Sequence, residues 1–124
     1  MIAGIVTSRL EAVVSISVHA PKGQSETLSA VIDTGFSGFI TLPPDLIARM
    51  ELPYSATESM VLANGSESPF RIFKATVHWH GQRMAVPVHE SDADALVGMA
   101  LLYGSRLIMD IVENGPVRVE PIVE

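Results

Sequence analysis

The sequence predicts an all-β protein, a closed barrel of short antiparallel strands with one or two short helices. Apolar and polar residues alternate with a period of two along much of the chain, which is typical of strands with one buried face. Turns rich in glycine and proline separate these short segments, and helical patterns are few. The chain has 124 residues with no repeat, linker or low-complexity stretch, so we expect a single domain over residues 1–124.

The first two predicted strands form a hairpin. Val14, Ile16 and Val18 share one face of the first strand, and polar residues occupy the other. A turn follows at residues 21–23, where proline and glycine interrupt the pattern. The second strand covers about residues 27–32, so the hairpin delivers an acidic residue, Asp33, at its far end.

The middle of the chain predicts one helix and two further hairpins. Two prolines and an acidic residue at the start of segment 43–50 favour a short helix there. Segments 59–63 and 70–80 look like strands around Asn64-Gly65, a dipeptide favoured where a tight hairpin needs positive φ. A turn near residues 80–82 leads into another strand, at 84–89.

The last third of the chain adds short elements of the same kinds. The pattern predicts strands at 95–97, 107–112 and 117–123, and a short helix at about 100–104. Each strand is short and bounded by turn residues, as in other barrels and sandwiches.

Composition excludes several classes of function. The formal net charge is −6 and the basic residues are scattered, so no nucleic-acid partner is expected. The chain has no cysteine and therefore no disulfide framework or thiolate site. It shows no signal peptide, no membrane span and no phosphate-cradling glycine loop, so we expect a cytoplasmic protein without membrane contact or cofactor.

The segment that could carry chemistry is Asp33-Thr34-Gly35, which ends an apolar strand. One interpretation is structural: Asp33 accepts hydrogen bonds from nearby backbone N–H groups, and Gly35 permits the bend. The other is catalytic, because amide hydrolysis needs groups that take a proton from water and donate one to the substrate. The tripeptide alone leaves both open.

Three elements in order favour the catalytic interpretation. Val31-Ile32-Asp33-Thr34-Gly35 resembles the active-site loop of retropepsin-like (clan AA) aspartic peptidases. Leu96-Val97-Gly98 is similar to the apolar pair and glycine that pass under that loop in the family. Asn64-Gly65 lies between them, where the family has its flap. The form looks closest to the single-domain bacterial and archaeal members.

The resemblance implies an endopeptidase that works as a homodimer on a peptide or protein substrate. Each copy supplies one Asp33, and two carboxylates sharing a proton activate water. Thr34 is expected to reach the partner loop, and the Gly35 N–H to support the carboxylate. Further roles implied by the resemblance are substrate binding by Phe36, Ser37, Leu62, Ala63, Asn64 and Gly65, and support of the active-site loop by Leu96, Val97 and Gly98. We also expect apolar residues around 86–88 to line a pocket, and segments 1–6 and 117–123 to form an intermolecular sheet.

Two positions depart from the family pattern. Phe36 stands where members usually carry a small Ala or Ser, and Met99 stands where many carry a charged or amide residue. An alternative function is therefore a catalytically silent dimerisation or peptide-binding module with the same fold.

The sequence also contains residues for two other chemistries. His78 and His80 share a strand face and could bind zinc if His89 converged on them. Alternation instead places them on a solvated face, so no metal is expected. A serine hydrolase is disfavoured because the chain lacks a Gly-x-Ser-x-Gly elbow.

Overall fold

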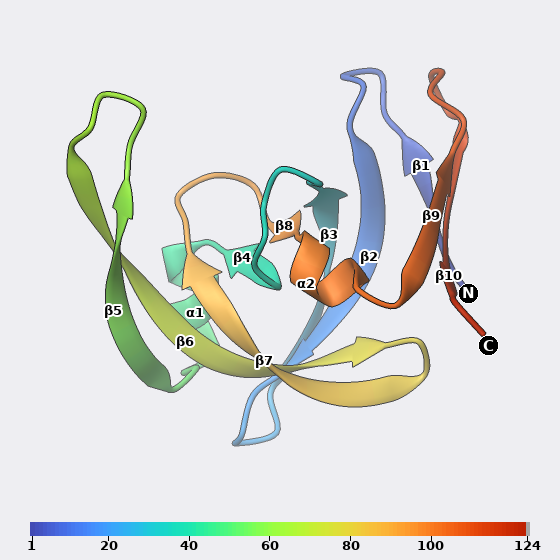
Figure 1. The fold of residues 1–124 in the computed structure, drawn as a ribbon. Coiled ribbons are helices and arrows are strands. Elements are labelled where there is room, and N and C mark those ends of the chain that lie inside the picture. Colours follow the sequence, from blue (N-terminus) through green and yellow to red (C-terminus); the bar gives the residue numbers. More distant parts are fainter. Residues whose placement is uncertain (124) are drawn as a thin grey trace.

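The computed structural model describes residues 1–123 and is built mostly of strands, with 54% of the chain in strands and few helices (Figure 1). The elements in chain order are β1 (Ile2–Val6), β2 (Ala12–His19), β3 (Ser25–Ile32), β4 (Ile40–Leu42), α1 (Pro44–Arg49), β5 (Tyr54–Val61), β6 (Glu67–Trp79), β7 (Gln82–Glu90), β8 (Leu96–Val97), α2 (Met99–Leu102), β9 (Ser105–Met109) and β10 (Pro116–Pro121). The predicted predominance of strands is confirmed.

The strands pair in the order β5-β6-β7-β4-β8-β3-β2-β1-β10-β9, and β6 also pairs with β2. A path through β2, β3, β8, β4, β7 and β6 therefore returns to β2. The prediction that all strands are antiparallel is wrong for two pairs, because β3 with β8 and β4 with β7 are parallel. In both pairs a long stretch of chain separates the partners, so no tight turn constrains their direction.

The core lies beneath the alternating strands. Val14, Ile16 and Val18 are each at most 2% exposed, and β2 pairs with β3 in register from Val13↔Val31 to His19↔Ser25, which confirms the first hairpin. On β6, the face opposite the exposed His78 is also buried, as the low exposure of Val77 and Trp79 shows. The strand pattern thus identified the buried faces correctly.

Two hairpin turns differ in their backbone geometry. At the β6–β7 turn, His80 and Gly81 both have positive φ, 50° and 75°, as a two-residue hairpin with the twist of its strands requires. At the β5–β6 turn only Gly65 has positive φ, 82°, and the Asn64 side chain accepts the Ser66 N–H at 3.0 Å instead. The expected tight Asn64-Gly65 turn is therefore a longer loop.

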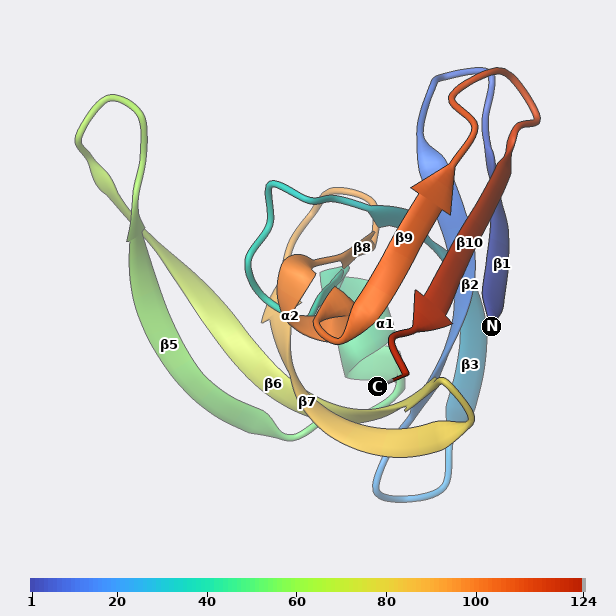
Figure 2. The ribbon, with the colours of Figure 1, turned by 45° about the vertical axis from the view of Figure 1, so that its right-hand side comes forward.

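Strand ends also differ from prediction. β5 and β6 are longer than expected and form a hairpin that projects from the rest of the molecule, on the side opposite β9 and β10 (Figure 2). β9 ends at Met109, because Ile111 and Val112 lie in an exposed turn rather than in a strand. Within residues 1–123, neither helix has the length and apolar character needed to cross a bilayer.

Candidate active site

Asp33 lies directly after β3 and is held mainly through its backbone. Its N–H donates to the carbonyl oxygen of Val97 at 2.9 Å. Its carbonyl oxygen accepts the Phe36 N–H at 3.2 Å, and its carboxylate accepts the Gly35 N–H at 2.9 Å. The side chain is half-buried while Thr34 and Gly35 are exposed. The loop therefore offers a carboxylate of fixed position at the protein surface.

The strand β8 and the start of α2 support this loop from below. Val31 pairs with Leu96 and Ile32 with Val97 in parallel register. Immediately after β8, the Gly98 N–H donates to Phe39 and the Met99 N–H donates to Phe36, with N···O distances of 2.9 and 2.8 Å. The structure thus brings the predicted supporting residues against the Asp33 loop.

Gly98 is required by the close approach of the two segments. A Cβ at this position would come within 2.5 Å of Cδ2 of Phe36 and 2.8 Å of its carbonyl oxygen. Real Cβ atoms do not approach other atoms so closely, so any side chain at residue 98 would displace the loop.

Thr41, which was not among the predicted site residues, braces the same region. Thr41 is 6% exposed, and its hydroxyl accepts the Leu96 N–H at 2.9 Å. This bond satisfies a backbone donor of β8 inside the protein. The only signal in the sequence was a hydroxyl residue between Ile40 and Leu42, both fully buried.

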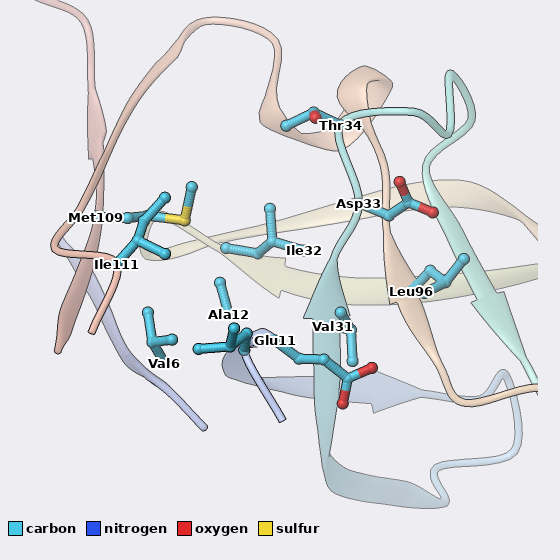
Figure 3. A pocket seen from close by; sticks show the side chains of 11 residues that line it. Val6, Glu11, Ala12, Val31, Ile32, Asp33, Thr34, Leu96, Met109 and Ile111 are labelled. Atoms are coloured by element: carbon cyan, nitrogen blue, oxygen red, sulfur yellow. The ribbon is translucent and has the colours of Figure 1, made fainter. Parts of the chain in front are cut away.

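A cavity of ≈ 380 Å³ lies beside Asp33 and Thr34 (Figure 3). Most of its walls are apolar: Val6, Leu10, Ala12, Val31, Ile32, Leu96, Met109 and Ile111. The Asp33 carboxylate is directed away from the Val6, Met109 and Ile111 side of this cavity. The cavity therefore borders the Asp33 loop, but the Asp33 carboxylate does not point into it.

A second hollow shares Thr34 with the first. Its lining includes Met99, Tyr103 and Leu107. Thr34 is thus an exposed residue between two apolar hollows on one face of the molecule.

The predicted substrate-binding residues fall into two separate places. Phe36 is half-buried and packs inward, and Ser37 is exposed beside it. Leu62, Ala63, Asn64 and Gly65 lie at the exposed tip of the projecting β5–β6 hairpin (Figure 1). The structure does not bring this tip to the cavity that Asp33 lines.

The predicted pocket around residues 86–88 is wrong. Val86 and Val88 are 2% and 0% exposed and belong to the core. Val86 and Val88 are two positions apart on β7, so both side chains point to the inner face of the strand and are not available to line a surface pocket.

The three candidate zinc ligands do not converge. His78 is exposed on β6, and His80 places its Nε2 2.8 Å from the Ser105 hydroxyl. His89 instead packs between the rings of Phe36 and Phe70. Among residues 1–123, no group of three or more His, Cys, Asp or Glu side chains could hold a metal ion.

The arrangement matches a solved structure. No model of a known protein family matches the chain, and no curated protein does. Among solved structures, a retropepsin-like aspartic protease from Rickettsia conorii matches with a TM-score of 0.54 and 14% sequence identity. The match covers 96% of this chain and 88% of that one.

The chain therefore has a retropepsin-like fold, as its three sequence elements predicted. At 14% identity, the match shows the fold alone.

Proposed function

We propose that the chain is an aspartic endopeptidase in which two copies each contribute Asp33 to one active site. The observation that carries this proposal is the Asp33 loop itself: the Asp33 backbone N–H donates to the Val97 carbonyl oxygen, and its carboxylate, at the surface, accepts the Gly35 N–H. Such a rigid setting suits an acid that has to hold and move a proton at a defined position.

The proposed reaction uses the two carboxylates as a pair. The ionised Asp33 takes a proton from a water molecule, and that water attacks the peptide carbonyl carbon. The protonated Asp33 of the other copy donates its proton to the carbonyl oxygen, which gives a tetrahedral intermediate. The first Asp33 then passes the proton it took from water to the leaving amine, the second takes a proton back from a hydroxyl of the intermediate, and the C–N bond breaks. One chain supplies one such aspartate, so the proposed site needs a second copy.

The second copy requires a surface other than the terminal strands. Both strands expected to form an intermolecular sheet are paired on both edges within the chain: β1 lies between β2 and β10, and β10 lies between β1 and β9. That expectation is wrong because these edges are already hydrogen-bonded.

The face around Thr34 is the surface we propose for the second copy. Exposed apolar side chains gather along the two hollows that share Thr34; they are Leu10, Met99, Tyr103 and Ile111. Their exposed fractions range from 48% for Met99 to 90% for Tyr103. A patch of this kind favours association, and a two-fold axis near Thr34 would bring the two Asp33 loops together.

In this proposal the β5–β6 hairpin serves as the flap. Its tip is exposed and apolar, with Met60, Val61 and Leu62 between 42% and 71% exposed. Closure over an extended peptide would exclude water and bury these side chains. The preferred substrate is then a peptide with apolar residues on either side of the cleaved bond.

Asp33→Asn tests the proposal. The amide is nearly isosteric with the carboxylate but neither accepts nor shares the required proton. We expect the wild type to cleave members of a peptide library and the variant to lose cleavage while circular dichroism and sedimentation stay unchanged. Equal turnover by both proteins would assign the activity elsewhere.

The same experiment tests the alternative of a catalytically silent module. If the wild type binds library peptides without cleaving them at any pH from 4 to 8, the fold serves for binding alone. The feature that favours this alternative is Phe36, a bulky residue directly after Gly35 in the Asp33 loop.

A further inference from the structure

Three aromatic rings connect the Asp33 loop to the β5–β6 hairpin. Phe36 in the loop meets His89 of β7 edge to face, with ring centroids 5.4 Å apart and an interplanar angle of 87°. The other side of the cluster is Phe70 of β6, whose ring stacks on His89 at 5.0 Å and 25°. Both geometries are favourable for aromatic pairs.

The Phe36 ring is tightly packed at its end of this cluster. A Cβ at Gly38 would come within 2.5 Å of Cζ of Phe36, and a Cβ at Gly98 would come equally close to its Cδ2. The ring thus occupies space that two glycines leave free. The Phe36 carbonyl oxygen accepts the Met99 N–H, so backbone and side chain are both fixed.

The Phe70 end lies within the paired part of the hairpin. Phe70 is opposite Glu58 of β5, nearer the body of the protein than the tip at Asn64-Gly65. A displacement of the hairpin that moves Phe70 therefore also moves the ring on which Phe36 rests.

We propose that Phe36 and His89 are positioning residues, and that the Phe36–His89–Phe70 bridge couples the orientation of the Asp33 loop to the root of the β5–β6 hairpin. In its consequence for catalysis the inference rests on the proposed function. The bridge itself is a property of the fold and is measurable without any substrate.

The bridge is suited to a neutral His89 ring. Burial lowers the pKa of His89, which the negative charge of Glu58 on β5 only partly offsets. The neighbours of His89 on the adjacent strands, Thr41 of β4 and Ile72 of β6, are uncharged. Glu90, the residue next to His89, forms an ion pair with Arg71. Because side chains alternate along a strand, Glu90 points to the opposite face of β7 from His89.

Two substitutions of His89 distinguish the effect of its aromatic ring from the effect of its protonation. His89→Phe keeps an aromatic ring and cannot take a proton, whereas His89→Ala removes the ring. We expect His89→Ala to lower kcat by on the order of tenfold with a smaller change in KM, because the Asp33 loop loses its orientation. His89→Phe should restore turnover, and His78→Ala, at an exposed position, serves as control.

Amide hydrogen exchange of the same variants supplies a readout that needs no activity. In His89→Ala we expect faster exchange in the Asp33 loop and in the part of the hairpin near Phe70. Protection there, measured relative to the intrinsic exchange rate at each pH, should decrease in the wild type as the pH falls below about 6.5, and His89→Phe should abolish this loss of protection.

Each outcome decides for or against the bridge. Unchanged exchange and kcat in His89→Ala would overturn it, and so would a His89→Phe protein that behaves like His89→Ala. A wild type that cleaves no peptide would overturn the proposed function, while the exchange measurements would still test the coupling.

Discussion

At the scale of single residues, the position of Asp33 is set mainly by backbone contacts and by glycines. The carboxylate receives one hydrogen bond from within residues 1–123, that of the Gly35 N–H. The loop path depends on Gly38 and Gly98, where a Cβ would collide with Phe36. A substitution at these glycines should therefore affect the site more than many substitutions of polar neighbours.

Gly98→Ala tests this dependence. The new methyl group would overlap the Phe36 ring, and forced overpacking of this kind costs about 1–3 kcal/mol. We expect the free energy of unfolding in urea to fall by that amount and peptide cleavage to be lost. Ser37→Ala, in the same loop but exposed, should leave the unfolding curve unchanged; equal curves for both variants would contradict the close packing.

Two partly buried histidines predict how stability depends on pH. Burial lowers the pKa of His80 and of His89 from the ordinary value of 6.5. Below pH 6.5 the unfolded chain takes up protons at these rings before the folded protein does, so stability is lost as the pH falls toward the folded pKa values. The contribution of the two neutral histidines to the free energy of unfolding is fully present above about pH 7.

Thermal unfolding between pH 8 and pH 5 measures this effect. We expect the wild-type Tm to fall below about pH 6.5 and the double variant His80→Gln/His89→Phe to show a flatter profile. Glu26 acts in a separate range, because hydrogen bonding to Arg49 lowers the pKa of its carboxyl group below 4.5. A wild-type Tm that does not change over this range would contradict the prediction.

At the scale of elements, local patterns predicted the hairpins well and the long-range pairs poorly. The β2–β3 hairpin, with Asp33 at its end, follows from alternation and one turn. The parallel pairs of β8 with β3 and β7 with β4 leave no local signal, because partners far apart in sequence determine them. The closed barrel stays a prediction.

The same distinction explains the candidate site. Asp33, Thr34 and Gly98 were recognisable from short motifs, whereas Thr41 and the packing of His89 depend on strands that meet only in the folded chain. The sequence suggests His89 only as a zinc ligand, because its position on an alternating strand does not reveal the two rings beside it.

Gly65→Val tests whether the β5–β6 hairpin closes over substrate. A β-branched residue resists the φ of 82° at this position, with a cost of roughly 1–2 kcal/mol. Gly81→Val is a matched control, because Gly81 also has positive φ and no heavy atom lies within 4 Å of a Cβ at either glycine. We expect similar losses of stability and a loss of turnover in Gly65→Val alone. Equal turnover of the two variants would mean that the hairpin is not a flap.

At the scale of the whole molecule, the proposed site exists only in a pair of chains. Specific activity should therefore fall on dilution through the dimer dissociation constant. Sedimentation at the same concentrations should show the monomer fraction rising in parallel. A monomer that cleaves peptide at the full rate would contradict a shared site.

Tyr103→Glu tests the face proposed for the second copy. Tyr103 is 90% exposed, so the substitution should leave the fold intact while placing a charge in an apolar contact. We expect the dimer dissociation constant to rise at least tenfold, corresponding to about 1.4 kcal/mol. Val61→Glu, at an apolar position on the hairpin that is 71% exposed, should not change association. If both variants associate like the wild type, the second copy binds another face.

The parallel pairing of β8 with β3 also fixes when the Asp33 loop can form during synthesis. The Asp33 N–H bonds to Val97, and all of the chain between β3 and β8 is made before that acceptor leaves the ribosome. Pairings across so long a stretch form slowly compared with local hairpins. A nascent chain therefore carries the aspartate for most of its synthesis without the support that orients it, and the orientation of the acid is among the last features that folding supplies.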